Sequence, residues 1–212
     1  MINIHTVACP SAPRPRGRPR AFDRDQALDR AAETFWRLGY EGASIVDLTA
    51  AMGVTPQSLY AAFGCKAELY RGALARYRAT EGAFFACALD QEPTAAKAFE
   101  RAFAEAVHAY SRPGRPRGCM LANAALACAA EHQDIAAHVA ALRADMMAAI
   151  RARLERGQQD GDLATDADPP SLARYLLALL QGLSQQARDG AGEADLAAAA
   201  AYATAELTRL SR

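Results

Sequence analysis

Closely spaced arginines form the most concentrated charge in the chain. Residues 14–20 read Arg-Pro-Arg-Gly-Arg-Pro-Arg and contain no acid. Proline holds such a segment extended, glycine lets the backbone approach a surface closely, and guanidinium groups are drawn to phosphates and to the narrow minor groove of A·T-rich DNA. We therefore expect Arg16, Arg18 and Arg20 to contact DNA. A disordered basic tail with only nonspecific affinity is the alternative.

The cysteines indicate neither a disulfide framework nor a zinc site. The chain has an odd number of them at irregular spacing, without a Cys-x-x-Cys pair, namely Cys9, Cys65, Cys87, Cys119 and Cys128. Cys65 precedes Lys66 at a predicted helix N-terminus, and both features lower a thiol pKa, so Cys65 is the candidate for a redox role, although an inert thiol is favoured. Glu131 and His138 could share a helix face, but we predict no metal and no cofactor.

The elements that position these residues are predicted to be helices. Alanine, leucine, arginine and glutamate dominate after Phe22, and no stretch alternates apolar and polar residues for long. Glycine and proline mark the breaks. We predict an all-α fold of nine helices, over residues 23–38, 44–52, 56–63, 66–89, 94–110, 120–130, 134–158, 171–188 and 194–210. The arginine-containing segment 111–118 is expected to be a solvated loop.

Residues 44–63 have the outline of a helix-turn-helix. Gly53 permits the sharp turn between two short helices, Thr55 can cap the second, and Pro56 is well placed at its first position. An ordinary helical hairpin has the same outline. The basic segment before it, and the tyrosine and lysine after it, favour the interpretation that one helix enters the major groove of DNA.

The pattern of residues 22–70 also resembles a known family. Phe35-Trp36-x-x-Gly39-Tyr40-x-x-x-Ser44-Ile45-x-x-Leu48 and Gly53-Val54-Thr55-x-x-x-Leu59-Tyr60-x-x-Phe63-x-x-Lys66-x-x-Leu69 are similar to the N-terminal signature of TetR/AcrR transcription regulators. The resemblance implies a nine-helix TetR-like architecture with a three-helix DNA-binding part. It also implies that Tyr60 and Lys66 clamp the DNA backbone. On the same resemblance, Ser44 and Thr55 offer cap hydroxyls and helix N-termini to phosphates. Gln57 and Ser58 would face base edges, where glutamine can form two hydrogen bonds with adenine. Ala62 and Cys65 depart from the family pattern, which has a phosphate-binding histidine and a capping residue there.

The resemblance divides the chain into a disordered basic arm at 1–20, a DNA-binding domain at 21–66, and an effector-binding and dimerisation domain at 67–212. It implies a cavity for a small effector, which we expect to be apolar or aromatic. Apolar and aromatic residues of the later helices, with one amide, are the candidates for the wall: Phe99, Phe103, Val107, Met120, Leu121, Asn123, Met146, Met147, Ile150 and Tyr175. Two apolar stripes are candidates for a homodimer interface: Leu172, Leu176, Leu179, Leu183, Leu196, Ala200, Ala203 and Leu207. Burial within one subunit is the alternative.

Composition limits the function in several ways. The chain has 212 residues, 51% of them hydrophobic, and equal numbers of basic and acidic residues, 24 of each. A net charge of zero alone disfavours nucleic-acid binding, but four arginines in one arm supply charge where DNA contact is expected. No apolar run reaches the length of a membrane span, and no signal core is present, so we expect a cytoplasmic protein without a membrane partner.

The sequence favours a DNA-binding repressor over the alternatives. An enzyme is disfavoured because no phosphate-binding glycine loop, His-Glu-x-x-His motif or nucleophile elbow occurs. We expect a dimer that binds a palindromic double-stranded operator and is released by a small molecule. A thiol- or metal-responsive regulator is the second interpretation, and an architectural DNA binder that uses only the arm is the third.

Overall fold

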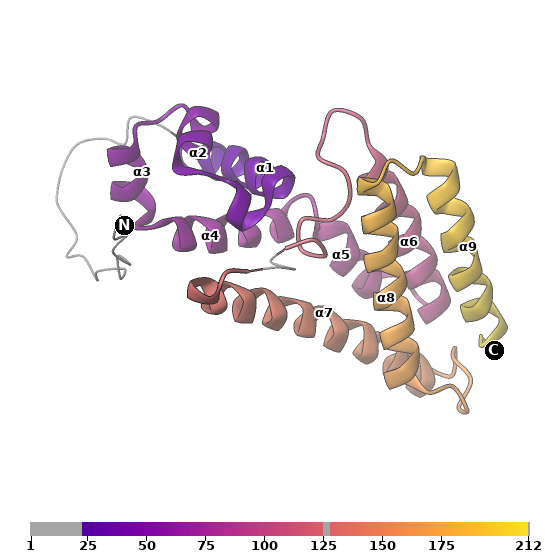
Figure 1. Cartoon of the computed structure of the whole chain (residues 1–212). Coiled ribbons are helices and arrows are strands. Elements are labelled where there is room, and N and C mark those ends of the chain that lie inside the picture. The colour runs from indigo at the N-terminus through magenta and orange to yellow at the C-terminus, as the bar shows by residue number, and fades with distance from the viewer. Residues whose placement is uncertain (1–22, 125–127, 212) are drawn as a thin grey trace.

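The computed structural model describes residues 23–124 and 128–211, so Arg16, Arg18 and Arg20 lie outside the described residues. Within these ranges the chain forms nine α-helices, one short 3-10 helix and no strand, which confirms the all-α class (Figure 1). The helices are α1 (Arg24–Gly42), α2 (Ile45–Met52), α3 (Pro56–Phe63), α4 (Lys66–Ala79), α5 (Ala83–Gln91), α6 (Ala95–Ser111), α7 (Gln133–Asp160), α8 (Pro169–Arg188) and α9 (Glu193–Arg209), with the 3-10 turn at Ala130–His132.

Helix α1 begins where the sequence predicts and ends later. The Asp23 carboxylate accepts hydrogen bonds from the backbone N–H groups of Asp25 and Gln26, which caps the helix. Gly39 adopts φ 74°, as expected for a residue that interrupts a helix, yet the chain makes one more turn to Gly42. The predicted end at Leu38 is therefore early by one turn.

The sequence predicts one helix over residues 66–89, and this prediction is wrong. The chain breaks at Thr80–Gly82 into α4 and α5, and the Gly82 N–H donates to the carbonyl of Tyr77 at 2.9 Å. A Cβ on Gly82 would lie 3.2 Å from a ring carbon of Tyr77, so the break is packed tightly against the ring of that tyrosine.

The helix predicted over residues 120–130 is also wrong for the part that the structure describes. Residues 120–124 form turns, and the 3-10 helix begins only at Ala130. Ser184 on α8 binds this segment, because its hydroxyl accepts from the Cys119 N–H at 2.7 Å and from the Asn123 side-chain amide at 2.9 Å. The described residues still form nine α-helices, because the split of residues 66–89 into α4 and α5 offsets the loss of the helix predicted over residues 120–130.

The helices place the N-terminal part and the last two helices at opposite ends of the molecule. In Figure 1, α1–α3 lie at one end, α4 runs from them towards the middle, and α8 and α9 stand side by side at the other end. Aromatic rings join α4 to α1: Tyr70 meets Phe35 edge-on at 4.8 Å, and Tyr77 meets Trp36 at 5.0 Å between ring centroids. Helix α4 therefore shares a core with the N-terminal part and also enters the larger helical part.

The segment 111–118 is a loop after Ser111 and is exposed at residues 113–115, as the sequence indicates, but the prediction that the whole segment is solvated misses the contacts of its arginines. Arg112 and Arg115 form ion pairs with Glu81, Arg115 also pairs with Glu33, and Arg117 donates to the carbonyl of Ala191. The mistake has a simple cause, since arginines in a Pro/Gly-rich loop show nothing in sequence of the distant carboxylates that they reach.

Candidate nucleic-acid interface and ligand cavity

Helices α2 and α3 are fixed by local signals that the sequence contains. The Ser44 hydroxyl accepts from the Asp47 N–H at 3.1 Å while the Asp47 carboxylate accepts from the Ser44 N–H at 2.9 Å, which forms a capping box. Gly53 ends α2 in the left-handed conformation, and the Thr55 hydroxyl caps α3 by accepting from the Ser58 N–H at 3.2 Å.

A buried core sets which face of α3 is outward. Leu48 and Leu59 are fully buried, and Met52 and Phe63 nearly so. A fully buried leucine or phenylalanine stabilises a fold by about 1.5–3 kcal/mol, so these residues hold α3 in one orientation.

The residues predicted to contact DNA fall on the outward face of α3. Thr55, Pro56, Gln57 and Tyr60 are exposed, and Ser58 is half-buried. Tyr60 keeps 47% of its surface exposed, so it is not a core tyrosine. The structure thus brings the α3 candidates together along one edge, where a partner molecule could contact them at the same time.

The two helix N-termini differ as anion sites. The first turn of α2 contains Asp47, whose carboxylate bonds to Ser44, and these hydrogen bonds lower the pKa of Asp47. A phosphate at Ser44 would therefore meet a negative charge. The first turn of α3 has no acid, so the N-terminus behind Thr55 is the better phosphate site.

Lys66 lies in a different environment from the predicted phosphate clamp. Its ammonium stands 4.5 Å from the centroid of the Tyr40 ring, over the ring face, and the side chain is half-buried. Burial lowers the pKa of Lys66, against the opposing effect of the nearby Glu41 carboxylate. The structure thus places Lys66 as a support for the end of α1.

Two arginines near α3 were missed at the sequence level. The guanidinium of Arg24 stands 4.9 Å from the centroid of the Phe63 ring, and that of Arg30 lies close to Gly53 at the turn. Both come from α1, whose neighbours in space a linear motif does not reveal. They add positive charge beside a helix pair that otherwise carries none between Ser44 and Phe63.

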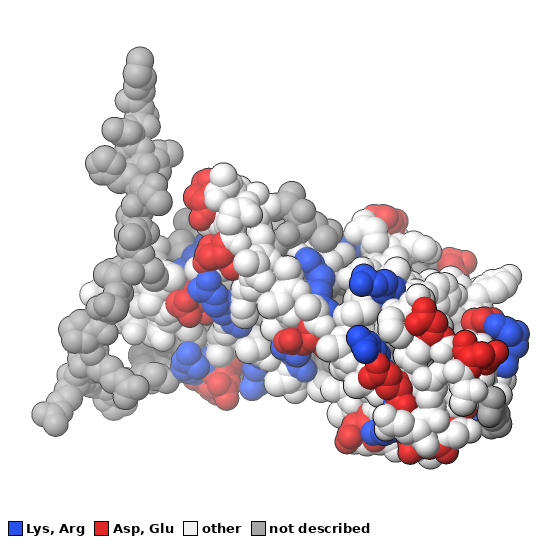
Figure 2. All heavy atoms as spheres, turned by 90° about the horizontal axis from the view of Figure 1, so that it is seen from below, with Lys and Arg blue, Asp and Glu red and all other residues white. Residues whose placement is uncertain are grey.

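Charges on the rest of the body are mixed. On the face shown in Figure 2, basic and acidic side chains are interspersed over the described residues. This distribution agrees with the formal net charge of zero and argues against a second extended DNA-binding surface on that face.

A cavity of about 420 Å³ lies among α4, α5, α6, α7 and α8. Its wall is mainly apolar and includes the aromatic pair Phe84 and Phe85. Tyr77 and Tyr110 also line it, and burial raises the pKa of both phenols well above the ordinary value, which keeps them neutral. The Tyr77 hydroxyl donates to the Cys119 sulfur at 3.4 Å. The complete lining is Ala75, Tyr77, Arg78, Ala79, Gly82, Phe84, Phe85, Ala86, Leu89, Tyr110, Cys119, Leu121, Asp145, Met146, Ala149 and Leu180.

Most residues predicted to line a cavity lie elsewhere. Only Met146 and Leu121 are in this wall. The aromatic and aliphatic candidates Phe99, Phe103, Met120 and Ile150 are packed in the core, and Phe103 with Val107 borders a separate groove between α6 and α9. Asn123 bonds to Ser184, Met147 is half-buried outside the wall, and Tyr175 is 44% exposed on α8. The wall instead includes Phe84 and Phe85 of α5, which follow the break at Thr80–Gly82.

Six of the eight candidate interface residues are buried within the single chain, which corrects that prediction. They are Leu176, Leu183, Leu196, Ala200, Ala203 and Leu207, while Leu172 and Leu179 are half-buried. The stripe is apolar because it packs against the chain's own helices. The surface that remains available on these helices carries Tyr175 and Tyr202, the latter 80% exposed.

The structure gives no support to a metal site or to a special thiol at Cys65. Within residues 23–124 and 128–211, no three His, Cys, Asp or Glu side chains gather as metal ligands would. Cys65 is half-buried and makes no capping hydrogen bond with the described part of α4. In the same ranges, no helix combines the length and apolarity that crossing a membrane requires.

Known proteins resemble both halves of the chain. A family model described as bacterial regulatory proteins, tetR family, matches residues 27–73, and one described as tetracyclin repressor-like, C-terminal domain, matches residues 98–202. The HTH-type transcriptional repressor ComR of Escherichia coli (strain K12) is 34% identical over 180 residues, which is 83% of this chain and 84% of that protein. The repressor BdcR of the same organism is 31% identical over 187 residues, or 88% of this chain and 90% of its own.

A solved structure supports the same relationship. The TetR family transcriptional regulator CifR, in complex with 26-bp double-strand operator DNA, is 42% identical, covers 89% of this chain and 98% of its own, and gives a TM-score of 0.86. The described fold, the helix-turn-helix and these matches lead to one conclusion: the chain belongs to the TetR family of bacterial regulatory proteins.

Proposed function

We propose that this protein is a homodimeric transcriptional repressor that binds a palindromic operator through α3 and leaves it when a small apolar molecule occupies the cavity. One observation carries the proposal: Thr55, Gln57 and Tyr60 share the exposed face of a helix that buried leucines hold in place. The similarity to CifR, whose structure contains operator DNA, supports it. No step requires catalysis, and access to chromosomal operators places the action in the bacterial cytoplasm.

Each part of α3 has a separate role in this proposal. Gln57 and Ser58 contact base edges, and the amide of Gln57 is suited to adenine. Thr55 and the helix N-terminus bind phosphate, Tyr60 contacts the backbone, and Arg24 adds a cation from α1. Arg16, Arg18 and Arg20, which lie outside the described residues, are proposed to enter the adjacent minor groove.

The outward faces of α8 and α9 supply the dimer interface. Each helix carries one exposed tyrosine there, Tyr175 on α8 and Tyr202 on α9, next to small residues, so two helix pairs can approach closely. The small residues are the exposed Ala178, Ala198 and Ala205 and the half-buried Gly182. Two copies would form a four-helix bundle, and the twofold axis would match a palindrome.

The cavity supplies the effector site. A volume of about 420 Å³ with an apolar, aromatic wall suits a small hydrophobic molecule, and the neutral phenols of Tyr77 and Tyr110 can bind one polar group on it. Occupancy is proposed to move α4, which joins the cavity wall to α1, and so to change the separation of the two α3 helices from one DNA turn, about 34 Å. The effector must bind the DNA-free state more tightly to do this.

Selection of binding sites from random duplex DNA tests the proposal. Wild type and Tyr60→Ala would be selected in parallel, with Arg101→Gln as the control, because Arg101 pairs with Glu92 and Glu105 on the body and lies outside both α3 and the proposed interface. We expect the wild type and control to enrich one palindrome of about 15–25 base pairs, and the Tyr60 variant to lose it. Enrichment of A·T-rich tracts without symmetry would instead leave only the arm as a DNA-binding element, and would reject reading by α3.

Deletion of residues 1–20 tests the arm on the selected palindrome. The truncated protein should bind more weakly, with a slope of log affinity against log salt that is shallower by about 0.9 for each lost phosphate contact. Fluorescence anisotropy titrations from low to high salt give both slopes. Equal slopes would exclude phosphate contact by the arm.

A further inference from the structure

The loop of residues 112–118 connects two residues of the cavity wall. Tyr110 precedes it, Cys119 follows it, and both line the cavity. The Gly118 N–H donates to the Tyr110 carbonyl at 2.9 Å, which closes the base of the loop. A change in the cavity that displaces either wall residue therefore acts on this loop.

The base of the loop is fixed to α8. The buried Ser184 hydroxyl accepts from the Cys119 N–H at 2.7 Å, and a Cβ on Gly118 would come within 2.5 Å of the Ser184 carbonyl oxygen. Arg117 also donates to the carbonyl of Ala191, just before α9. Such close packing leaves little freedom at the base, so the loop moves with its surroundings and not independently.

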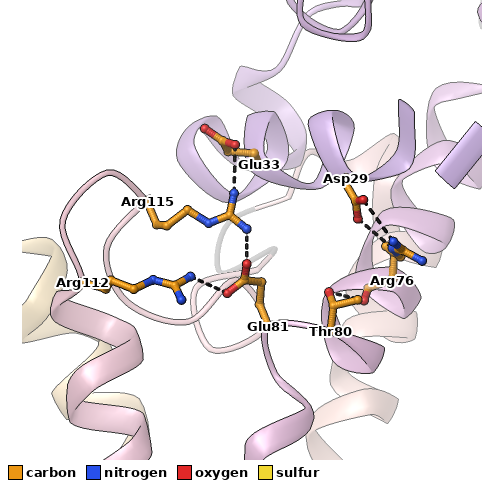
Figure 3. Close-up of polar contacts among 7 residues, drawn as sticks. All are labelled: Asp29, Glu33, Arg76, Thr80, Glu81, Arg112 and Arg115. Carbon is orange, nitrogen blue, oxygen red and sulfur yellow. Dashed lines mark hydrogen bonds and ion pairs between the residues drawn. The ribbon is translucent and has the colours of Figure 1, made fainter. Parts of the chain in front are cut away.

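The tip of the loop reaches α1 and the α4–α5 turn through ion pairs. Figure 3 shows Arg115 between two carboxylates, that of Glu33 on α1 and that of Glu81 on the turn. The distance to Glu33 is 3.3 Å, and Arg112 binds the second oxygen of Glu81 at 2.6 Å. Glu81 is thus shared by two arginines, and Arg115 is shared by two acids.

The α4–α5 turn is itself next to the cavity. Ala79 and Gly82 line the cavity on either side of Thr80 and Glu81. A molecule in the cavity that pushes on this wall therefore displaces the Glu81 backbone. Through Arg115 the displacement reaches Glu33, one helical turn from Asp29 on the same helix.

Asp29 holds α1 to α4 independently. Its two oxygens accept from the Arg76 guanidinium at 2.7 and 3.0 Å, a bidentate pair (Figure 3). Helix α1 is thus attached to α4 at Asp29 and by the ring contacts of Phe35 and Trp36, and to the loop at Glu33. Movement of the turn relative to α4 would change the attachment at Glu33 and leave the others, and so would act on the orientation of α1 and of the helix-turn-helix that packs on it.

We propose that the Glu33–Arg115–Glu81 ion pairs transmit the state of the cavity to the DNA-binding helices. This inference rests on the proposed function, since it requires that cavity and operator are coupled. The three side chains are partly exposed, and exposed ion pairs contribute little free energy. The relay therefore accounts for only a part of the coupling, a change in operator affinity by a factor of about two to five.

Reciprocity gives a test that needs no identified effector. If a molecule in the cavity changes the affinity for the operator, operator binding must change the affinity of the cavity for that molecule by the same factor. We expect this change to appear in the hydrogen exchange of the cavity wall. Hydrogen exchange would be measured on the full-length protein, free and saturated with the selected palindromic duplex, in peptides that cover residues 77–89 and 110–121. The variants are Arg115→Gln, which removes both ion pairs of Arg115, and Glu33→Gln, which removes only its pair with α1. Arg101→Gln is the matched control, because Arg101 pairs with Glu92 and Glu105, both outside the relay.

We expect the duplex to change exchange of these peptides in wild type and in Arg101→Gln, and this change to shrink about two- to fivefold in both relay variants. An unreduced change in Arg115→Gln and Glu33→Gln would overturn the relay while leaving operator–cavity coupling intact. A wild type that binds the duplex with no change in these peptides would overturn the coupling itself, and the relay with it. If only one variant folds, it decides alone, since each breaks the Glu33–Arg115 contact.

Discussion

Glu81 shows how one side chain makes the structure sensitive to pH. Partial burial on its own would raise the pKa of this carboxyl, but hydrogen bonds from Arg115 and Arg112 outweigh it and lower the pKa below the ordinary 4.5. An acid with a lowered folded pKa stabilises the fold fully above its unfolded pKa and loses that contribution as the pH falls through the folded value. We therefore predict that Glu81→Gln flattens the loss of thermal stability between about pH 5 and pH 3. Melting temperatures across this range test it, with Glu100→Gln on the surface of α6 as control. An equally steep loss in Glu81→Gln would show that the arginines do not favour the ionised carboxyl.

Residues whose place depends on local signals could be predicted, and those that depend on remote contacts could not. Thr55 caps α3 and so fixes the direction of Gln57 and Tyr60, all within six residues. The partners of Arg115 lie 34 and 82 positions away, at Glu81 and Glu33. Arg24 and Lys66 likewise lie against rings, those of Phe63 and Tyr40, that only the packing of α1 brings near.

At the scale of elements, the loop 112–118 depends on one glycine. Gly118 has φ +76°, and a Cβ there would lie 2.5 Å from the Ser184 carbonyl oxygen. We predict that Gly118→Ala lowers the free energy of unfolding by about 2–5 kcal/mol, from about 1–2 for left-handed strain and about 1–3 for overpacking. Gly114→Ala is the matched control, because Gly114 has φ +77° in the same loop with nothing within 4 Å of its Cβ, and it should cost only the strain. Urea unfolding measures both, and equal losses would mean that the base of the loop can relax.

The elements themselves were predictable wherever the caps and breaks are local. Ser44, Gly53, Thr55 and Pro56 gave α2 and α3 nearly to the residue. The α4–α5 break was missed because Thr80-Glu81-Gly82 lies in a helix-forming sequence and is stabilised by contact with Tyr77. Residues 120–124 have helix-forming composition, yet the hydroxyl of Ser184, some 60 positions away, binds the backbone N–H of Cys119 just before them and the side-chain amide of Asn123.

At the scale of the whole molecule, the account requires two copies joined at the end away from α3. The all-α class and the two-part layout follow from composition and from the family pattern, but the interface could not be read from apolar spacing, because the core stripe of α8 and α9 is more apolar than their outer face. We predict that wild type sediments at twice the chain mass of 22.6 kDa and that Tyr202→Arg shifts it towards the monomer. Val46→Arg, which replaces an apolar side chain 75% exposed on α2, is the control and should leave the mass unchanged. A monomeric wild type at micromolar concentration, or a Tyr202→Arg variant that stays dimeric, would move the interface elsewhere.

The affinity of the full-length protein for three duplexes tests the central claim most directly. They are the selected palindrome, the same duplex with one half-site scrambled, and the duplex with both half-sites scrambled. Sequence reading by two α3 helices predicts that the intact palindrome binds at least about a thousandfold more tightly than fully scrambled DNA, with two chains per duplex and a large loss when either half-site is scrambled. Equal affinity for all three duplexes would contradict the account, because it would mean that Gln57 and its neighbours read no bases.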